Sequence, residues 1–250
     1  MGLDSENTVG RCQSQVNQQI EGPEDYMKRQ AVENFRSRDY WVVENAEYAQ
    51  ASFRSRKCAR VINELAVNRD CTLLDVGCGP AALRSLLNPN ISYHGIDIAI
   101  HEPGSHLREL DISRQAISFD NKRFDFVVAL GFFEYMGQQQ DRCFEEIRTI
   151  LKDDGKFMMS YVNFGHFRQK IWPTYNNVQP ISEMMKSLNE TFKVEKRFPA
   201  FHHWRHKQPG KNSIPALQMR VNFNIPIFSP LLAVEYFFIC SLPESVPANM

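Results

Sequence analysis

Short apolar runs alternate with stretches of helical periodicity through the middle of the chain, from Asp70 onward. The runs are bounded by polar or glycine-containing segments, which is typical of buried strands. They predict strands at residues 72–76, 93–98, 107–110, 124–130 and 156–162. A helix predicted over residues 141–151 separates the last two strands and stops at Asp153, Asp154 and Gly155. This alternation predicts an α/β fold built on a parallel sheet.

The pattern weakens after Asn163. A helix is predicted over residues 181–189, and strands are predicted at residues 192–198 and 233–242. Between these two strands, residues 202–230 contain four prolines, which predicts an irregular insertion.

The N-terminal part differs from the rest in composition. Residues 1–22 are polar with few large apolar side chains, and they predict a flexible leader. Residues 23–68 combine helical periodicity with many aromatic side chains, and they predict a helical cap. This cap either covers a bound cofactor or only completes the core. Residues 69–245 then form the main domain.

Charge, hydropathy and cysteine usage narrow the partners that the protein can have. The 29 basic residues balance the 29 acidic ones, which disfavours nucleic acid and membrane surfaces and favours a small molecule. No apolar run approaches the ~20 residues of a membrane span, and no secretory signal is visible, so we expect a cytoplasmic protein. The six cysteines form no C-x-x-C pair, which predicts reduced thiols.

A glycine-rich turn follows the first predicted strand, in the sequence LLDVGCGP at residues 73–80. Gly77 and Gly79 allow a sharp turn and let a ligand approach the backbone closely. A helix predicted over residues 81–87 would offer its first amides to an anionic group. The turn by itself is equally compatible with a strand-to-helix connection that binds nothing.

An acidic residue ends the next predicted strand. Asp97 falls 20 residues after Gly77, where a carboxylate can accept hydrogen bonds from both hydroxyls of a ribose. Such an aspartate can also cap a helix. Together, the turn and the carboxylate predict an adenosine-containing cofactor. Gly77, Gly79 and Ala82 also satisfy a loose dinucleotide fingerprint, so NAD is an alternative on these residues alone.

Five motifs in order distinguish between these cofactors. They are LLDVGCG at residues 73–79, GID at 95–97, LD at 110–111, FDFV at 124–127 and LKDDG at 151–155. Over about residues 72–162 the chain therefore resembles the class I S-adenosylmethionine-dependent methyltransferases. It departs from the family pattern at Pro80 and at Asp154, where a small or acidic residue and a second glycine are common. Neither departure removes a contact that the cofactor needs.

The resemblance implies a Rossmann-like fold with a seven-stranded, mostly parallel sheet, an antiparallel last strand and helices on both faces. It implies S-adenosylmethionine as the cofactor and S-adenosylhomocysteine as the product. Asp75 would face the cationic methionine end, Asp97 would hold the ribose, and Asp111 with Ile112 would recognise the adenine. The implied cofactor-binding residues are Asp75, Gly77, Cys78, Gly79, Asp97, Ile98, Asp111, Ile112, Leu130 and Gly131.

Methyl transfer from a sulfonium is an in-line displacement, so a base is needed only when the acceptor must lose a proton. His166 is the candidate base, because NFGHFR at residues 163–168 resembles a stretch of the MetW-like branch of the family. Tyr135 is the second catalytic candidate, at a position where many relatives have histidine. The predicted substrate-binding residues are Phe133, Glu134, Arg168, His202 and His203.

Several of these residues can instead have a purely structural role. Phe133 can be plain core packing, and His166 can be a loop histidine that caps a helix. His202 and His206 could share a helix face as metal ligands, but the nearby prolines disfavour a helix and no carboxylate or cysteine completes the site. No metal is therefore predicted.

We expect a methyltransferase, monomeric or homodimeric, that acts on an oxygen or nitrogen of a small molecule, in secondary metabolite or sugar biosynthesis. The rival from another class is a non-catalytic, MetW-like binding or regulatory protein that keeps the fold and assists a partner enzyme. An NAD-dependent oxidoreductase is a third interpretation. It lacks a recognisable tyrosine–lysine pair and would make the five-motif match accidental.

Overall fold

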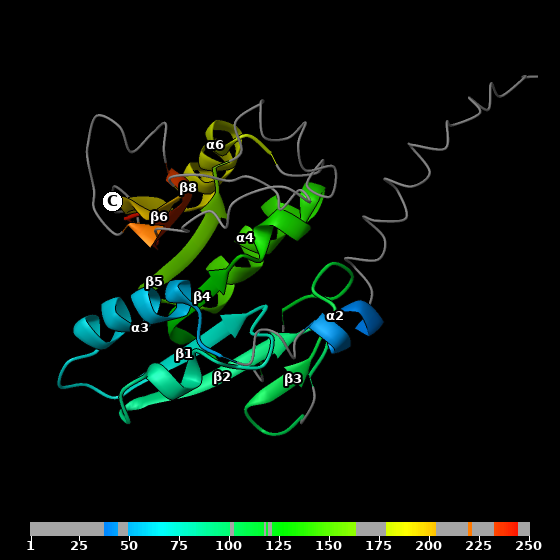
Figure 1. Ribbon diagram of the computed structural model, residues 1–250. Coiled ribbons are helices and arrows are strands. Elements are labelled where there is room, and N and C mark those ends of the chain that lie inside the picture. The colour runs from blue at the N-terminus through cyan, green and yellow to red at the C-terminus, as the bar shows by residue number, and fades with distance from the viewer. Residues whose placement is uncertain are drawn as a thin grey trace, which may run out of the picture.

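One mixed sheet organises the computed structural model, which describes residues 38–44, 50–100, 103–117, 119, 122–163, 179–203, 220–221 and 233–244 (Figure 1). Its strands are β1 (Cys71–Val76), β2 (Ile91–Asp97), β3 (Leu107–Glu109), β4 (Phe124–Leu130), β5 (Leu151–Val162), β6 (Lys193–His203), β7 (Arg220–Val221) and β8 (Ala233–Ser241). Their order across the sheet is β3-β2-β1-β4-β5-β8-β6-β7. Strands β1 to β5 pair in parallel, whereas β8 pairs antiparallel with both β5 and β6.

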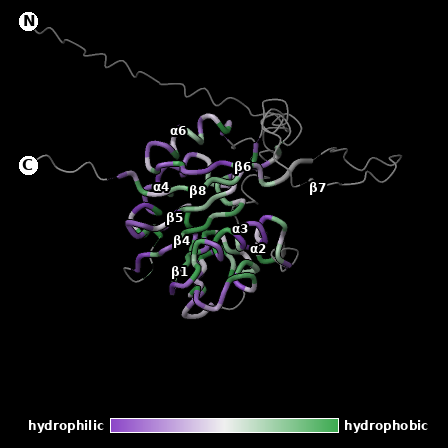
Figure 2. The backbone as a smooth tube through the Cα atoms, turned by 90° about the vertical axis from the view of Figure 1, so that its left-hand side faces the viewer, coloured by the Kyte–Doolittle hydropathy of each residue, from purple (hydrophilic) through white to green (hydrophobic). Residues whose placement is uncertain are grey.

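Helices cover both faces of this sheet. The described helices are α2 (Arg38–Glu44), α3 (Phe53–Leu65), α4 (Gln140–Ile150) and α6 (Ile181–Thr191), with short 3-10 helices η1 (Arg84–Leu86), η2 (Phe133–Tyr135) and η3 (Gly137–Gln139). In Figure 2, α4 and α3 lie on opposite sides of the hydrophobic central strands. The sheet is therefore buried on both faces, which explains why its parallel strands are almost continuously apolar.

Alternate residues of each strand feed two separate cores. In β1, Leu74 and Val76 pack in the core under α4 and α6, whereas Leu73 packs in the core under α3. Strand β4 repeats this division, with Val127 on the first side and Phe126 on the second. This follows from the two-residue period of a strand, which sends successive side chains to opposite faces.

The predicted α/β architecture is confirmed, with its seven strands, its antiparallel last strand and helices on both faces. The sheet has an eighth strand, the two-residue β7, which pairs with the end of β6 and lies in the region predicted as an insertion. The last predicted helix agrees with α6, and the two strands predicted after it agree with β6 and β8, although β6 continues to His203. Strand β5 begins earlier than predicted, because α4 ends at Ile150 and Leu151 already pairs with Phe124.

The helix predicted over residues 81–87 is wrong. The chain forms turns there and only one 3-10 turn, η1. Ala81 has a φ of 56°, in the left-handed region that an α-helix cannot contain. Because this helix is absent, the prediction that its first amides face an anionic group is also wrong.

Parts of the N-terminal and insertion predictions lie outside the described residues. The flexible leader at residues 1–22 is outside them, and the predicted cap at residues 23–68 is described only from α2 and from residue 50 through α3. Of the predicted insertion at residues 202–230, only residues 202–203 and 220–221 are described. Within the described part of the chain, no helix combines the length and apolar character that a membrane span requires.

Candidate functional site

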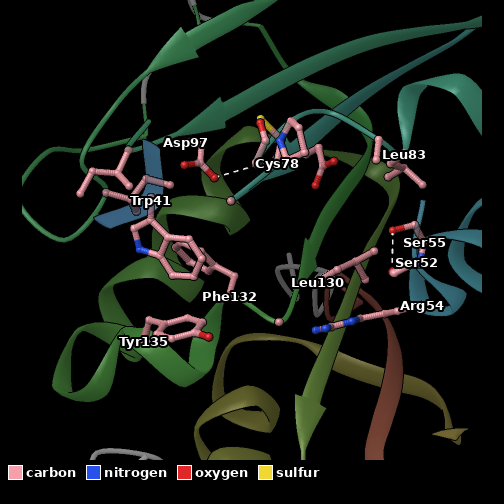
Figure 3. Close-up of a pocket in the computed structure, with 18 of the residues that line it drawn as sticks. Trp41, Ser52, Arg54, Ser55, Cys78, Leu83, Asp97, Leu130, Phe132 and Tyr135 are labelled. Atoms are coloured by element: carbon pink, nitrogen blue, oxygen red, sulfur yellow. Dashed lines mark hydrogen bonds between the residues drawn. The ribbon is translucent and has the colours of Figure 1, made fainter. Parts of the chain in front are cut away.

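A pocket opens where β1, β2 and β4 end, and helical elements close it from the other side (Figure 3). We call one side the strand-end wall, formed by residues 75–80, 97–98 and 110–113. We call the other side the helical wall, formed by Trp41 of α2, by Ser52, Arg54 and Ser55 at the start of α3, and by Phe132 and Tyr135 after β4. The carboxyl ends of parallel strands are the usual place for a ligand in an α/β sheet.

The glycine turn of the strand-end wall is fixed by backbone hydrogen bonds to the neighbouring strand. The N–H groups of Gly77 and Cys78 both donate to the carbonyl of Ile96, at 2.8 and 3.1 Å. Gly77 has a φ of 73°, and a Cβ added there would lie 2.7 Å from the Phe132 ring. Only glycine therefore fits at Gly77, both for its backbone and for the space beside Phe132.

Asp97 holds this turn from the end of β2. Its Oδ2 accepts a hydrogen bond from the Gly79 N–H at 2.8 Å, and its Oδ1 accepts one from the Ala99 N–H at 3.0 Å. Burial raises the pKa of Asp97, and these backbone hydrogen bonds oppose the shift. Each carboxylate oxygen keeps a further lone pair, so the group can still accept hydrogen bonds from a ligand in the pocket.

Asp75 is the most deeply buried acid of the strand-end wall, with 4% of its surface exposed. Its Oδ2 accepts a hydrogen bond from the Tyr93 hydroxyl at 2.8 Å. Burial raises the pKa of the Asp75 carboxyl to about 7, while the Tyr93 hydrogen bond acts against this shift. Asp75 also lines the pocket, so its charge near neutral pH depends on what the pocket holds.

Asp111 and Ile112 continue the strand-end wall after β3. Asp111 Oδ1 accepts hydrogen bonds from the N–H of Ser113 at 3.0 Å and from its hydroxyl at 2.6 Å. The carbonyl of Ile112 accepts a hydrogen bond from the Arg142 guanidinium of α4. This loop is thereby anchored on one side by its own turn and on the other by α4.

An aromatic pair dominates one end of the helical wall. The rings of Trp41 and Tyr135 meet edge to face, with 5.3 Å between their centroids and an interplanar angle of 86°. The helix that carries Trp41, α2, is tied to β3 because the Arg38 guanidinium donates to both Glu109 oxygens, at 2.8 and 3.1 Å. Trp41 therefore lies on a supported helix, although the Arg38–Glu109 bridge itself is exposed.

A buried charge cluster supports the other end of the helical wall. Arg54 lies directly over Gly131, so that a Cβ on that glycine would fall 1.9 Å from Arg54 Nη1. The same Nη1 lies 3.2 Å from Oε1 of Glu235, whose side chain is only 3% exposed. Figure 3 shows the Arg54 guanidinium and the Tyr135 hydroxyl pointing toward each other across the lower part of the pocket.

Glu134 lies behind this wall. It is 5% exposed, and burial together with the Glu235 carboxylate raises its pKa to about 7, against the opposing effect of Arg54. One arginine thus faces two buried carboxyls. At neutral pH the cluster is balanced best when one carboxyl holds a proton.

All ten predicted cofactor-binding residues line this single pocket, and the catalytic candidate Tyr135 lines it as well. They come from four separate turns, at residues 75–79, 97–98, 111–112 and 130–131. The residues that the sequence predicts as one cofactor site are therefore close together in the folded protein.

The predicted substrate-binding residues are placed less uniformly. Phe133 is fully buried and packs against Phe144, with ring centroids 4.6 Å apart, so it is part of the core and does not line the pocket. Glu134 is also turned inward, where the charge of Arg54 offsets part of the cost of its burial. Alternation around the tight turn of η2 sends these two side chains inward and Tyr135 outward.

Other predicted residues cannot be placed around the pocket. His202 and His203 end β6, where their backbone pairs with β7, and their side chains lie outside the described part. His166 and Arg168 lie outside the described residues, as does the rest of the MetW-like stretch after Asn163, which is not confirmed. Among the residues that are described, no group of three or more potential ligands could hold a metal ion.

Sequence reasoning missed Arg54 and the two serines beside it. Their signal was present in part, because Ser52 is followed by a helical pattern and accepts a hydrogen bond from the Ser55 N–H at 3.1 Å, as an N-cap does. A cap predicts where a helix starts. It does not predict that this helix starts at the mouth of a pocket.

Comparison with known proteins decides the family. A family model described as a methyltransferase domain matches residues 50–221, which is most of the chain. The chain belongs to the class I S-adenosylmethionine-dependent methyltransferases. Family membership confirms S-adenosylmethionine as the cofactor predicted from the five motifs. No curated protein matches this methyltransferase.

Solved structures share its fold at low sequence identity. A structure of the Haloferax volcanii Trm112 methyltransferase activator with its assigned methyltransferase matches with a TM-score of 0.57 and 16% identity, over 82% of this chain and 95% of that one. The plantazolicin methyltransferase BpumL, solved with a substrate analogue and S-adenosylhomocysteine, gives 0.55 and 14%, over 88% and 98%. The N-methyltransferase NodS from Bradyrhizobium japonicum WM9, solved with S-adenosylhomocysteine, gives 0.51 and 16%, over 87% and 99%.

The pocket of this methyltransferase fits the cofactor chemically. S-adenosylmethionine needs acceptors for two ribose hydroxyls and an anionic environment for its sulfonium and ammonium groups. Asp97 and the buried Asp75 both line the pocket, so its lining contains the carboxyl groups that this chemistry calls for. Gly77 leaves out the side chain that would fill the space between β1 and Phe132.

Proposed function

We propose that this methyltransferase transfers a methyl group from S-adenosylmethionine to an oxygen or nitrogen of a small-molecule acceptor. The observation that carries the proposal is that all ten predicted cofactor-binding residues line one pocket, eight of them on the strand-end wall, and that the opposite wall is aromatic and cationic. The neutral net charge also favours a small molecule over nucleic acid.

The strand-end wall binds the donor in this proposal. Asp97 accepts hydrogen bonds from the ribose hydroxyls while it holds the Gly79 turn. Asp111 and Ile112 recognise the adenine, and Asp75 lies beside the cationic methionine end. At the start of α3, Arg54 pairs with the carboxylate of the methionine portion, since it is the cation that lines this side of the pocket.

The helical wall positions the acceptor. The cofactor supplies an activated methyl group on a positively charged sulfur. Trp41 and Tyr135 offer ring surfaces that hold an acceptor in line with this group and exclude water, which can contribute several kcal/mol to the rate. Tyr135 and His166 are the proposed groups to orient the acceptor or to remove its proton when it is an alcohol or phenol.

Calorimetry and turnover test the proposal in two steps. Titration of the full-length protein with S-adenosylmethionine, S-adenosylhomocysteine and NAD should show binding of the first two only. Incubation of a metabolite pool with cofactor carrying a labelled methyl group should then yield a labelled small molecule by mass spectrometry. Absence of cofactor binding contradicts the donor assignment. Binding without any labelled product supports the rival function, a non-catalytic protein that assists a partner.

A further inference from the structure

A second groove lies on the outer side of α3, away from the cofactor pocket. Its walls are the exposed face of α3, with Arg56 and Arg60, and the 3-10 turn η1, with Leu86. The groove exists because the connection from β1 to β2 forms turns and η1, in place of the α-helix expected from the sequence. No residue of this groove lines the cofactor pocket.

The two walls of the groove are held at a fixed separation. The Asn63 side chain of α3 donates to the carbonyl of Leu86 at 2.9 Å, and its oxygen accepts from the N–H of Asn88 at 2.9 Å. The first contact joins α3 to η1, and the second joins it to the loop that follows η1. The groove is therefore preformed, and a ligand would not have to open it.

Cationic side chains without carboxylate partners surround the groove. Arg56, Arg60 and Arg84 are all exposed, and none forms an ion pair with another described residue. Elsewhere on the described surface, arginines of similar exposure do pair, as Arg69 does with Asp154 and Arg148 with Glu145. The groove is thus lined by two arginines that pair with no described carboxylate, Arg56 and Arg60, against one carboxylate, Glu64, and its net charge is positive.

Exposed apolar surface coincides with this charge. Val67, which lines the groove, is 59% exposed, and the neighbouring Leu65 is 43% exposed. They are the large apolar side chains that the described surface leaves most open. A contiguous site that combines arginine with exposed aliphatic side chains is typical of a surface that binds protein.

We infer that this groove binds an acidic segment of a partner protein, with carboxylates for Arg56 and Arg60 and an apolar side chain to cover Val67. Charge complementarity fixes the sign of the partner. The exposed apolar side chain of Val67 favours a polypeptide over a nucleic acid, because a polypeptide can supply an apolar side chain that covers it. This inference does not depend on the proposed methyl transfer.

Fluorescence anisotropy on the full-length protein tests the inference. The probe is a labelled synthetic peptide in which leucines alternate with glutamates and aspartates, and a matched peptide has serine in place of leucine. We expect saturable binding of the leucine peptide that weakens at high salt, with much weaker binding of the serine peptide. The double substitution Arg56→Glu with Arg60→Glu should weaken binding at least tenfold, and Val67→Ser should weaken it severalfold.

Matched variants make the result specific. Reversal of two arginines elsewhere on the surface, Arg123→Glu with Arg148→Glu, should leave peptide binding unchanged. Thermal unfolding and S-adenosylmethionine affinity should also be unchanged in the groove variants, because their side chains are exposed and lie outside the pocket.

Several outcomes would overturn the inference. The first is the absence of saturable peptide binding, or equal binding by the doubly reversed variant. A second is tighter binding of a single-stranded oligonucleotide than of the peptide, lost on the same reversal, which would assign the groove to nucleic acid. A third is self-association in sedimentation that is abolished by the reversal while the peptide does not bind, which would assign the groove to a second copy of the chain.

Discussion

The strand-end wall of the pocket is held by hydrogen bonds between neighbouring strand ends, whereas the helical wall is held by side chains from distant parts of the chain. In the first, Asp97 fixes Gly79 across 18 positions of sequence. In the second, Arg54 is held by Glu235, and Trp41 meets Tyr135. One pocket can therefore combine a wall that local sequence motifs predict with a wall that only the folded chain brings together.

The largest effect should come from the glycine on which the two walls meet. In Gly131→Ala, the new Cβ would occupy the space of the Arg54 guanidinium, at a residue whose φ is already 64°. Displacing Arg54 leaves the Glu235 carboxylate buried without its cation, and we expect a loss of about 3–5 kcal/mol in the free energy of unfolding. Chemical denaturation measures this loss.

Gly104→Ala is the matched control for this substitution. A Cβ added to Gly104 meets no atom within 4 Å, so its unfolding free energy should change little. Similar losses in both variants would contradict the role assigned to the Arg54–Glu235 pair.

The next largest effect should come from a substitution in the strand-end wall, and it should appear as weaker cofactor binding. Asp97→Ala removes the acceptor of the Gly79 N–H and the proposed acceptor of the ribose hydroxyls. Hydrogen bonds to a charged group are worth about 1.5–3 kcal/mol, so we expect about a hundredfold weaker S-adenosylmethionine binding by calorimetry. Asp153→Ala, at an exposed carboxylate that pairs with Arg123, should bind normally. Unchanged affinity in Asp97→Ala would remove Asp97 from the site.

Asp75 should make binding depend on pH. Its carboxyl has a pKa of about 7, so it is largely neutral below that pH and ionised above it. An ionised carboxylate attracts the cationic methionine end, and affinity should therefore rise about tenfold between about pH 6 and about pH 8. Calorimetry across this interval should show a flat profile for Asp75→Asn, and a slope that persists in this variant would assign the titration to another group.

The raised pKa of Asp75 has the opposite effect on the stability of the free protein, which should fall as the pH rises. The pKa of Asp75 is raised above its ordinary value of 3.8, so the folded state holds the proton more tightly than the unfolded state. Its contribution to stability is complete below about pH 4 and is lost as the pH rises through about 7. Thermal unfolding of Asp75→Asn should lack this part of the decline.

The smallest effect should come from the aromatic end of the helical wall. Trp41→Ala removes an edge-to-face contact worth about 0.5–1.5 kcal/mol, so the KM for the acceptor should rise about fivefold while cofactor affinity stays nearly constant. Trp41→Phe keeps an aromatic edge and should recover most of the loss. If only the affinity for the cofactor changes, Trp41 contacts the cofactor and not the acceptor.

The donor half of the site could be predicted from sequence because its contacts are local. Gly77, Asp97 and Asp111 each end or follow a strand, and the parallel order of the sheet brings strand ends together. The prediction failed at residues 81–87, where the left-handed Ala81 outweighed the helical propensity of ALRSLL and the chain forms turns and η1.

The helical wall could not be predicted, because its members are distant in sequence and individually ordinary. Nothing in the sequence around Arg54 indicates that it lies over Gly131 or pairs with Glu235. Glu134 and Tyr135 are adjacent, yet one turns into the core and the other into the pocket, since a single 3-10 turn divides them between two sides. That division depends on the packing of Phe133 against α4.

The hydrogen bond between Asp97 and Gly79 also bears on how this chain can evolve. A descendant without catalytic activity would still be under selection to keep Asp97. Loss of Asp97 would remove the hydrogen bond that holds the Gly79 turn as well as the proposed contact with the ribose. Retention of the glycine motif among descendants therefore reports on foldability as much as on activity. Trp41 lies on the helical wall, where its ring meets Tyr135, so its identity is the better indicator of whether a descendant keeps the pocket for a ligand.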